Sequence, residues 1–414
     1  MPTCRVCQGQ RLEQFLDLGD QPHCNSLLVP AELERAEPIY PLKVWFCYDC
    51  TTVQIDYTVP KEQMFSEYLY VSGTTETLKS HFRASAERLV DNLGLGPGDL
   101  VIDIGSNDGT WLKSYTRWKL RMLGVEPASN LSRQANAEGV ATLNRFFDAD
   151  TAREIIAGHG YPKLVTAAGV FFHLEELQSA TEGVRLLLDK GGTFCVQAIY
   201  LGEILRNTEF DNIYHEHLTY WTVSSIRQLF DRYGLEVYHA DLLPIHGGSL
   251  ELLVSVKGAR EVDNSVIRFL AQEKTLGLHE IATYRGFAER VWTIRDTLLT
   301  ILRDFKDRGK IVYAFGAPAK GATLLNSFGI TTNLVPLAVE RNLLKIGKII
   351  PGARIPIVDE DAAPVPDAYL VLPWNFLPEF LQKKRQYIMK GGAFIVPIPD
   401  PVVIKADNYG RYVS

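Results

Sequence analysis

The sequence predicts an α/β protein with doubly wound parallel sheets, and three observations support this fold class. Apolar segments typical of strands alternate with helical segments through the middle of the 414-residue chain. The segment 100–109, LVIDIGSNDG, is an apolar strand that runs into a glycine turn. A strand and glycine turn of the same kind return at 310–321, which suggests an old duplication. Because ligands bind at the carboxyl ends of such strands, we expect the functional residues there.

The composition is that of a soluble globular protein of two or three domains. The net charge of −6 gives no field that would attract nucleic acid or an anionic membrane, so we expect neither as a partner. No apolar run reaches about 18 residues, and the N-terminus lacks the pattern of a signal peptide. We therefore expect a cytoplasmic protein, whose six cysteines are metal ligands or, for Cys24 and Cys195, packing residues rather than disulfides.

Two Cys-x-x-Cys pairs predict a zinc site near the N-terminus. Cys4 and Cys7 form the first pair, and Cys47 and Cys50 form the second. Zinc prefers four thiolates in a tetrahedron, and each pair places two sulfurs on one tight turn. Residues 1–60 carry no basic stripe, which argues against a zinc module that reads nucleic acid. We therefore expect structural zinc, because four thiolates leave no open position for substrate.

The glycine turn of the first α/β unit has the spacing of a methyl-donor site. Asp103, Gly105 and Gly109 form the pattern DxGxxxG, which resembles the class I S-adenosylmethionine methyltransferases. Glu126 ends the next strand, where an acid can bind the ribose hydroxyls of the donor. We predict that these residues, with Asn107, bind S-adenosylmethionine. The rival, a nicotinamide dehydrogenase, would carry the fingerprint GxGxxG, which is absent here.

A crowded group of proton-handling residues, FDNIYHEHLTYW at 210–221, follows the strand at 192–198. Histidine titrates nearest neutral pH, and a neighbouring Glu or Tyr can orient it or tune its pKa. The run Tyr214-His215-Glu216-His217 therefore favours a general-base site. Two other interpretations stay open at this point. One is a solvated loop without chemistry. The other is a metal site, although HEH lacks the HExxH spacing that places two imidazoles on one helical face.

Four further side chains are candidates for the same edge of the sheet. His173 follows the strand at 163–168, and His246 lies in the run HGGS. Tyr68 and Tyr70 lie on an aromatic and polar connector that either packs structurally or lines a cleft. A buried core histidine is the structural alternative for His173, and a bulge is the alternative for the segment at His246.

The C-terminal part begins with helices at 258–309, where apolar residues recur with the spacing of one helix face. After the glycine turn at 310–321, further strands are expected at 335–339, 369–372 and 394–397. The backbone N–H groups of such a turn can hold a phosphate, with charge from Lys320, although a purely structural turn is the alternative. We assign Gly321 and Arg341, with His246, to the same substrate-binding set.

Taken together, the motifs resemble those of one family. CxxC…CxxC, DIGSNDG, FDNIYHEH, LPIHGGS and AFGAPAKG occur in the order typical of the three-domain bacterial sugar C-methyltransferases, and the similarity covers essentially the whole chain. The resemblance implies a zinc-binding domain at 1–65 and a Rossmann-like methyltransferase domain at 66–257. It also implies a helical connector with a C-terminal Rossmann-like domain at 258–414. The nucleotide sugar would lie between the outer domains, over the methyl donor.

The resemblance also implies a substrate and a set of roles. The family acts on nucleotide-linked 4-keto-deoxysugars, and we expect a dTDP-linked sugar and a monomeric enzyme. The family's base matches His217. The supporting groups match Tyr214, Glu216, His173 and either Tyr68 or Tyr70.

The chemistry follows from the substrate class. A 4-keto group acidifies the protons on C3 and C5, so a base can remove one and the enolate can attack the donor methyl; C3 is favoured and C5 is the alternative. His217 would take the proton, Tyr214 or His173 would bind the developing oxyanion, and Glu216 would orient an imidazole. The alternatives are a methyltransferase of another substrate, such as RNA or protein, a non-catalytic nucleotide-sugar binding protein, and a nicotinamide enzyme.

Overall fold

The computed structural model describes residues 2–68, 70–245 and 247–413, and the chain forms two compact units. The first unit comprises Met1–Glu13, Trp45–Gly202 and Leu218–Glu280. The second unit comprises Gln14–Val44, Glu203–His217 and Ile281–Ser414. Each unit is therefore assembled from segments that lie far apart in the sequence.

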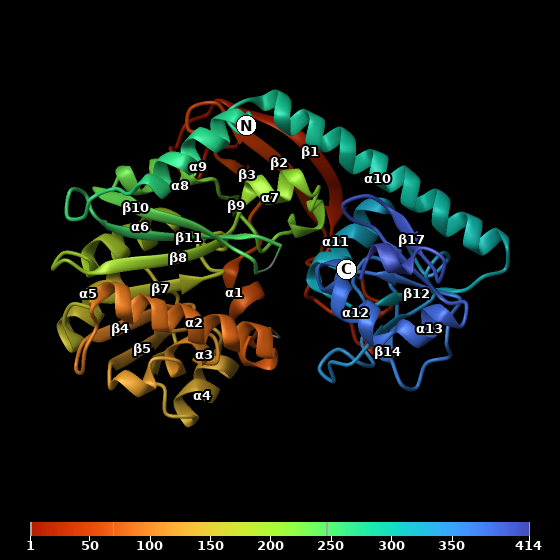
Figure 1. Ribbon diagram of the computed structural model, residues 1–414, viewed down its shortest axis with the longest axis horizontal. Coiled ribbons are helices and arrows are strands. Elements are labelled where there is room, and N and C mark those ends of the chain that lie inside the picture. The colour runs from red at the N-terminus through yellow and green to blue at the C-terminus, as the bar shows by residue number, and fades with distance from the viewer. Residues whose placement is uncertain (1, 69, 246, 414) are drawn as a thin grey trace. The chain divides into compact units, whose positions relative to one another are not determined.

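The first unit contains a seven-stranded sheet of order β10-β11-β8-β7-β4-β5-β6, and the strands from β10 to β5 follow one another down Figure 1. Strands β4 to β8 pair in parallel, whereas β11 is antiparallel to both β8 and β10. All five residues of β4 are buried, as expected of a central parallel strand. The strands are β4 (Leu100–Ile104), β5 (Arg121–Val125), β6 (Thr142–Leu143), β7 (Leu164–Ala168), β8 (Thr193–Ile199), β10 (Leu235–Leu243) and β11 (Ser249–Val256).

Helices alternate with these strands, which confirms the predicted doubly wound fold. Helix α2 shows how the sequence sets their bounds. The Thr75 side chain accepts a hydrogen bond from the Leu78 N–H at the helix start, and Gly94 ends the helix at φ +62°. The helices are α1 (Lys61–Phe65), α2 (Glu76–Leu93), α3 (Thr110–Lys113), α4 (Ser129–Ala137), α5 (Ala149–His159), α6 (Leu177–Leu187), α8 (Val223–Asp231) and α9 (Asn264–Thr275); α7 (Leu201–Arg206) begins in this unit and continues into the second.

The second unit contains a six-stranded sheet of order β14-β13-β12-β15-β16-β17. Its strands pair in parallel except for β17, which is antiparallel to β16. The predicted strand at 335–339 begins later, at Ala338, and β14 and β17 were not predicted because each is only three residues long. The strands are β12 (Val312–Phe315), β13 (Ala338–Glu340), β14 (Ile357–Asp359), β15 (Ala368–Val371), β16 (Ala393–Val396) and β17 (Val402–Ile404).

The long helix α10 (Ile281–Asp307) carries the predicted apolar face, and residues such as Phe287, Val291 and Leu298 on it are buried. The predicted helical stretch thus consists of α9 and α10. The other helices of the second unit are α11 (Ala319–Phe328), α12 (Leu377–Lys383) and α13 (Arg385–Met389).

A small four-stranded sheet has the order β1-β2-β3-β9. Strands β1 and β2 run from one unit into the other, and β3 pairs antiparallel with β9. Its strands are β1 (Leu12–Gln21), β2 (Tyr40–Cys47), β3 (Val53–Ile55) and β9 (Thr219–Tyr220). Among the residues that the structure describes, no helix is both long and apolar enough to cross a bilayer.

Candidate functional site

Glu126 lies one residue beyond β5, and two backbone turns hold its carboxylate. Oε2 accepts a hydrogen bond from the Asn107 N–H at 2.8 Å, and Oε1 accepts one from the Ala128 N–H at 2.8 Å. Burial raises the pKa of this carboxyl, and the two N–H groups oppose the shift. A carboxylate offers about four lone-pair positions, so positions remain for a pair of ribose hydroxyls. The geometry therefore fits a donor-binding acid.

Glycine at position 105 is required by both conformation and space. Gly105 has φ +66°, and a Cβ atom there would lie 2.4 Å from Cγ2 of Val170, in the turn after β7. The glycine thus lets two turns close together at the carboxyl edge of the sheet. Asp103 lies on β4 just before this turn and accepts a hydrogen bond from the Thr166 hydroxyl at 2.6 Å. Burial raises the pKa of Asp103 to about 7.

The side chains of Asn107 and Asn130 form hydrogen bonds with the backbone of the connector that precedes α2. The Asn107 side chain accepts a hydrogen bond from the Ser72 N–H at 2.9 Å and donates one to the Tyr70 carbonyl at 3.0 Å. Asn130 accepts from the Tyr68 N–H at 3.1 Å and donates to the Tyr68 carbonyl at 2.9 Å. These bonds place Tyr70 beside the predicted donor turn and Tyr68 beside the start of α4, although both tyrosines lie more than thirty residues before these partners in the sequence.

His173 lies after β7 at one end of a row of aromatic rings. Its ring centroid is 5.3 Å from that of Phe65, which is 5.5 Å from that of Tyr68. The Tyr68 and Tyr70 centroids are 6.4 Å apart. Desolvation, with the charge of Asp108 second, raises the pKa of Tyr70 to about 12, although the residue is 48% exposed. At neutral pH Tyr70 is therefore a hydrogen-bond donor rather than a base.

In the second unit, the segment Glu203–His217 is anchored by the buried residues Phe210 and Asp211. The Phe210 ring stacks on Phe328 of α11, with centroids 4.7 Å apart and planes at 26°. The buried Asp211 carboxylate accepts a hydrogen bond from the Trp374 Nε1–H at 2.7 Å. These contacts fix the start of the segment that carries Tyr214 to His217.

His217 is held in the tautomer that a general base needs. Its Nδ1 lies 2.7 Å from the Asn212 carbonyl oxygen, and because a carbonyl only accepts, the neutral ring carries its proton on Nδ1. Nε2 is then the nitrogen with the lone pair that can take a proton from a substrate. The Tyr214 ring packs on this imidazole with centroids 3.9 Å apart, which restricts the orientation of the ring.

His215 has a different environment from His217. It is 1% exposed, and its Nε2 lies 3.3 Å from the carbonyl oxygens of both Tyr40 and Pro41. Burial, with a smaller effect of His23, lowers the pKa of His215 to about 4. The residue is therefore a neutral donor to two backbone carbonyls at physiological pH. In HEH the lone pair therefore lies on Nε2 in His217 and on Nδ1 in His215, and the pKa of about 4 makes His215 a weak base.

The four predicted cysteines come together in the first unit. The sulfurs of Cys4 and Cys50 are 3.4 Å apart, those of Cys7 and Cys47 are 3.6 Å apart, and all four lie within 4.8 Å of one another. A zinc tetrahedron with bonds of about 2.3 Å separates its sulfurs by about 3.8 Å. The cluster therefore fits one zinc ion after small adjustments.

The turn after β12 repeats the arrangement of the donor turn. The carboxylate of Glu340, at the end of β13, accepts hydrogen bonds from the Ala317 N–H at 3.0 Å and the Arg341 N–H at 2.8 Å. Glu340 thus holds the turn after β12 as Glu126 holds the turn after β4. The Lys345 Nζ also contacts this turn and donates to the Ala317 carbonyl at 2.8 Å.

The predicted substrate-binding residues are spread over this part of the second unit. The Lys320 ammonium lies over the Trp374 ring at 4.0 Å; burial lowers its pKa, while the charges of Asp211 and Glu209 oppose the shift. A Cβ atom at Gly321 would lie 2.9 Å from the Leu372 side chain, so this glycine allows α11 to pack closely. The exposed Arg341 side chain binds the Glu360 carboxylate at 2.5 Å. His246 lies outside the described residues.

Three family models match consecutive parts of the chain. They are described as a zinc binding domain, matched at residues 4–65, a methyltransferase domain at 78–240, and a C-methyltransferase C-terminal domain at 244–399. The C-methyltransferase NovU of Streptomyces niveus is 36% identical over 408 residues, which cover 98% of this chain and 97% of NovU. This chain belongs to the C-methyltransferase family.

Solved structures of other proteins resemble parts of this C-methyltransferase at low identity. The PH0226 protein from Pyrococcus horikoshii OT3 matches with a TM-score of 0.37 and 14% identity, over 49% of this chain and all of that protein. Magnesium protoporphyrin IX methyltransferase from Synechocystis PCC 6803 matches with a TM-score of 0.33 and 13% identity, over 44% of this chain and 79% of that enzyme.

The C-methyltransferase carries site residues that sequence reasoning did not identify. Asn130 ties down Tyr68, Lys345 contacts the turn after β12, and His23 and Asn25 both contact the Glu216 carboxylate. For His23 and Asn25, the local signal was the run PHCNS, with several polar side chains, directly after a strand of mixed apolar and polar residues. Their partner is about 190 residues further along the chain, which no local pattern could indicate.

Proposed function

We propose that this C-methyltransferase transfers a methyl group from S-adenosylmethionine to a ring carbon of a nucleotide-linked 4-keto-deoxysugar. C3 is the favoured position and C5 the alternative. The observation that carries the proposal is the tautomer of His217, whose Nδ1–H is held by the Asn212 carbonyl. A C-methyltransferase must first make carbon nucleophilic, and the carbon next to a ketone becomes so when a base removes its proton.

The donor supplies an electrophilic methyl group when it is bound. Glu126 holds its ribose, and the turn at Asp103–Gly109 provides the backbone against which it lies. The proposal rests on the carboxylate geometry of Glu126 and on the narrow space at Gly105.

His217 Nε2 takes the proton from the carbon next to the ketone, and the electrons of the broken C–H bond enter the enolate. The enolate carbon forms the new bond to the methyl group, while the methyl–sulfur bond breaks and leaves S-adenosylhomocysteine. Until the methyl group is transferred, hydrogen-bond donors stabilise the negative charge on the enolate oxygen, a role for which Tyr214, His173 or a protonated Tyr70 is suited. His217 finally releases its proton to solvent.

Mass spectrometry of reactions with S-adenosylmethionine and a panel of nucleotide 4-keto-sugars tests the proposal. We expect a sugar product heavier by one methylene group, with S-adenosylhomocysteine formed in equal amount. NMR of the product then assigns the methyl to C3 or C5. Donor binding without methylation of any nucleotide 4-keto-sugar would reject this substrate class and leave a C-methyltransferase of another substrate.

A further inference from the structure

A buried polar cluster surrounds the Glu216 carboxylate in the second unit. Glu216 is fully buried, and its Oε1 accepts a hydrogen bond from the Asn25 side-chain amide at 2.5 Å. The Nε2 of His23 lies 2.9 Å from the same oxygen, although the ring N–H is not aligned closely enough for a regular hydrogen bond. The other ring nitrogen of His23 lies 3.1 Å from the Ser26 hydroxyl. Three side chains from one turn, at 23–26, are thus organised around one carboxylate.

The cluster also includes the thiol of Cys24. Two interpretations therefore have to be compared: a metal site, and a direct contact between His23 and Glu216. His23, Cys24 and Glu216 place ligand atoms within 4.8 Å of one another. Burial, and then the charge of Glu216, raises the pKa of the Cys24 thiol well above its usual range, so this sulfur stays protonated without a metal. The ammonium of Lys345 acts on the same thiol, and a second cation beside it would be repelled. Glu216 Oε1 is also already contacted by Asn25 and His23. These features favour a direct His23–Glu216 contact over a metal site.

We propose that His23 is a positioning residue that holds the Glu216 carboxylate next to the base His217. This inference rests on the proposed function, in which His217 removes the substrate proton. Glu216 was expected to orient an imidazole, and an imidazole that lies against it is that of His23.

Glu216 and His217 are joined by one peptide bond, so the position of the Glu216 side chain affects that of His217. A fully buried carboxylate is costly unless donors surround it, and a rotation that exposed it would move the neighbouring backbone. Asn25 donates a hydrogen bond to this carboxylate, the His23 ring contacts the same oxygen, and Ser26 lies within hydrogen-bond distance of the other His23 ring nitrogen. Catalytic groups act only when they are held within about half an ångström of the productive geometry. Holding Glu216 therefore keeps His217 in place through the main chain.

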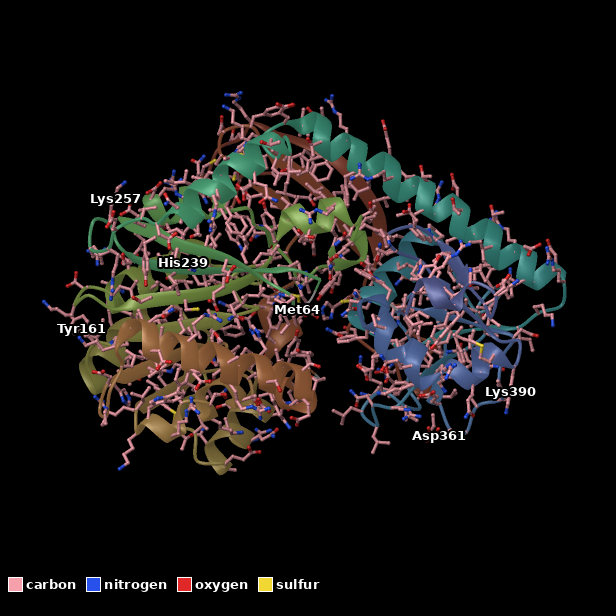
Figure 2. The ribbon with its side chains drawn as sticks, viewed as in Figure 1. Met64, Tyr161, His239, Lys257, Asp361 and Lys390 are labelled. Carbon is pink, nitrogen blue, oxygen red and sulfur yellow. The ribbon has the colours of Figure 1, made fainter. Side chains whose placement is uncertain are left out.

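Two substitutions separate positioning from general stability. His23→Leu removes both ring nitrogens, whereas His23→Gln keeps an amide donor near the carboxylate. We expect His23→Leu to lower kcat about 10- to 100-fold, because the polar contact to a buried carboxylate is lost, with KM for S-adenosylmethionine unchanged. His23→Gln should restore most of kcat. The matched control is His239→Leu, which removes another histidine–carboxylate contact, His239 to Asp263 at 2.5 Å, and should leave kcat unchanged. His239 is labelled in Figure 2.

NMR spectroscopy detects the His23–Glu216 contact without requiring enzyme turnover. In protein with 15N-labelled histidine, the His23 ring resonances should shift on Glu216→Gln, while those of His239 should not. The proposal is overturned if His23→Leu leaves kcat unchanged, or if the His23 ring resonances do not shift on Glu216→Gln. It is also overturned in favour of a metal site if metal analysis finds two ions per chain and His23→Leu loses one of them. Wild-type protein that methylates no keto-sugar would contradict the proposed function instead, and the NMR response would still decide the His23–Glu216 contact.

Discussion

Backbone carbonyls give the two histidines of the segment Tyr214–His217 different chemistry. Asn212 binds the Nδ1 side of His217, whereas Tyr40 and Pro41 bind the Nε2 side of His215. The first arrangement leaves Nε2 as the basic nitrogen, and the second uses the imidazole as a buried donor. Sequence reasoning placed the base at His217 through the family resemblance, because spacing alone does not say which carbonyl each ring meets.

His217→Asn is predicted to lower kcat about 10²- to 10⁴-fold, the usual loss when a general base is removed. Donor and sugar nucleotide should still bind, which calorimetry measures. Solvent exchange gives the sharper test: with S-adenosylhomocysteine bound in D2O, wild type should exchange the proton next to the ketone and His217→Asn should not. Normal exchange in His217→Asn, together with loss of exchange in His173→Asn, would make His173 the base.

His215 is predicted to make the fold sensitive to acid. Its pKa is about 4 in the folded protein and 6.5 in its unperturbed state, so between these values the unfolded chain binds a proton that the folded chain does not. Folding stability is therefore complete above pH 6.5 and falls as the pH drops toward 4, by about 3 kcal/mol from this residue. Urea unfolding from pH 7.5 to pH 4 should show a smaller loss for His215→Gln than for wild type. Equal losses would mean that His215 titrates normally.

At the scale of elements, the strand and turn motifs were predictable because each is local. A run of apolar residues followed by DxGxxxG specifies β4 and its turn, and the spacing of CxxC specifies the cysteine knuckles. The connector at 68–73 could not be placed in this way. Its position depends on Asn107, in the turn after β4, and on Asn130, in α4, which come together only once the sheet has formed. The three-residue strands β14 and β17 likewise depend on their neighbours rather than on their own residues.

Glu126→Gln and Glu126→Ala are predicted to weaken donor binding to different extents. Glutamine keeps one acceptor oxygen but loses the charge, and alanine loses both oxygens and the backbone bonds to Asn107 and Ala128. We expect a loss of about 1 to 3 kcal/mol for alanine and less for glutamine. Calorimetric titration with S-adenosylmethionine checks this order. Unchanged affinity in both variants would place the donor elsewhere.

Lys320→Met is predicted to lower the free energy of unfolding by about 2 to 4 kcal/mol, since it leaves the buried Asp211 and Glu209 without their nearby cation. Denaturant unfolding measures the loss, and Lys384→Met serves as a lysine control elsewhere in this unit, where the ammonium pairs with Glu360. If stability is unchanged and KM for the sugar nucleotide rises instead, Lys320 holds the diphosphate, as the sequence suggested.

At the scale of the whole molecule, each compact unit is made from three stretches of chain. Long-range order of this kind cannot be read from motifs, because the stretches 14–44 and 203–217 carry no signal that they belong with 281–414. The family models follow the chain in three consecutive blocks, with borders near residues 65–78 and 240–244. The blocks describe similarity along the sequence, and the units describe which residues pack together.

One zinc ion per chain is predicted at Cys4, Cys7, Cys47 and Cys50. Because structural zinc is coupled to folding, Cys4→Ser with Cys50→Ser should lose the metal and lower the unfolding temperature. Elemental analysis of freshly purified protein gives the stoichiometry. Cys195→Ser is the control, since this buried cysteine lies outside the cluster and its replacement should leave the zinc content unchanged. Zinc retained in the double variant would place the ion elsewhere.

The interleaved units also constrain how such enzymes can be recombined. A single crossover between two related genes, placed anywhere from residue 45 to 202, would join the stretch 14–44 of one parent to the stretches 203–217 and 281–414 of the other. Asn25 would then come from one parent and Glu216 from the other, so the two sides of this buried contact would not have evolved together. Chimeras with one junction should therefore fold poorly. Successful exchanges need at least three inserted pieces, or gradual change by point substitutions.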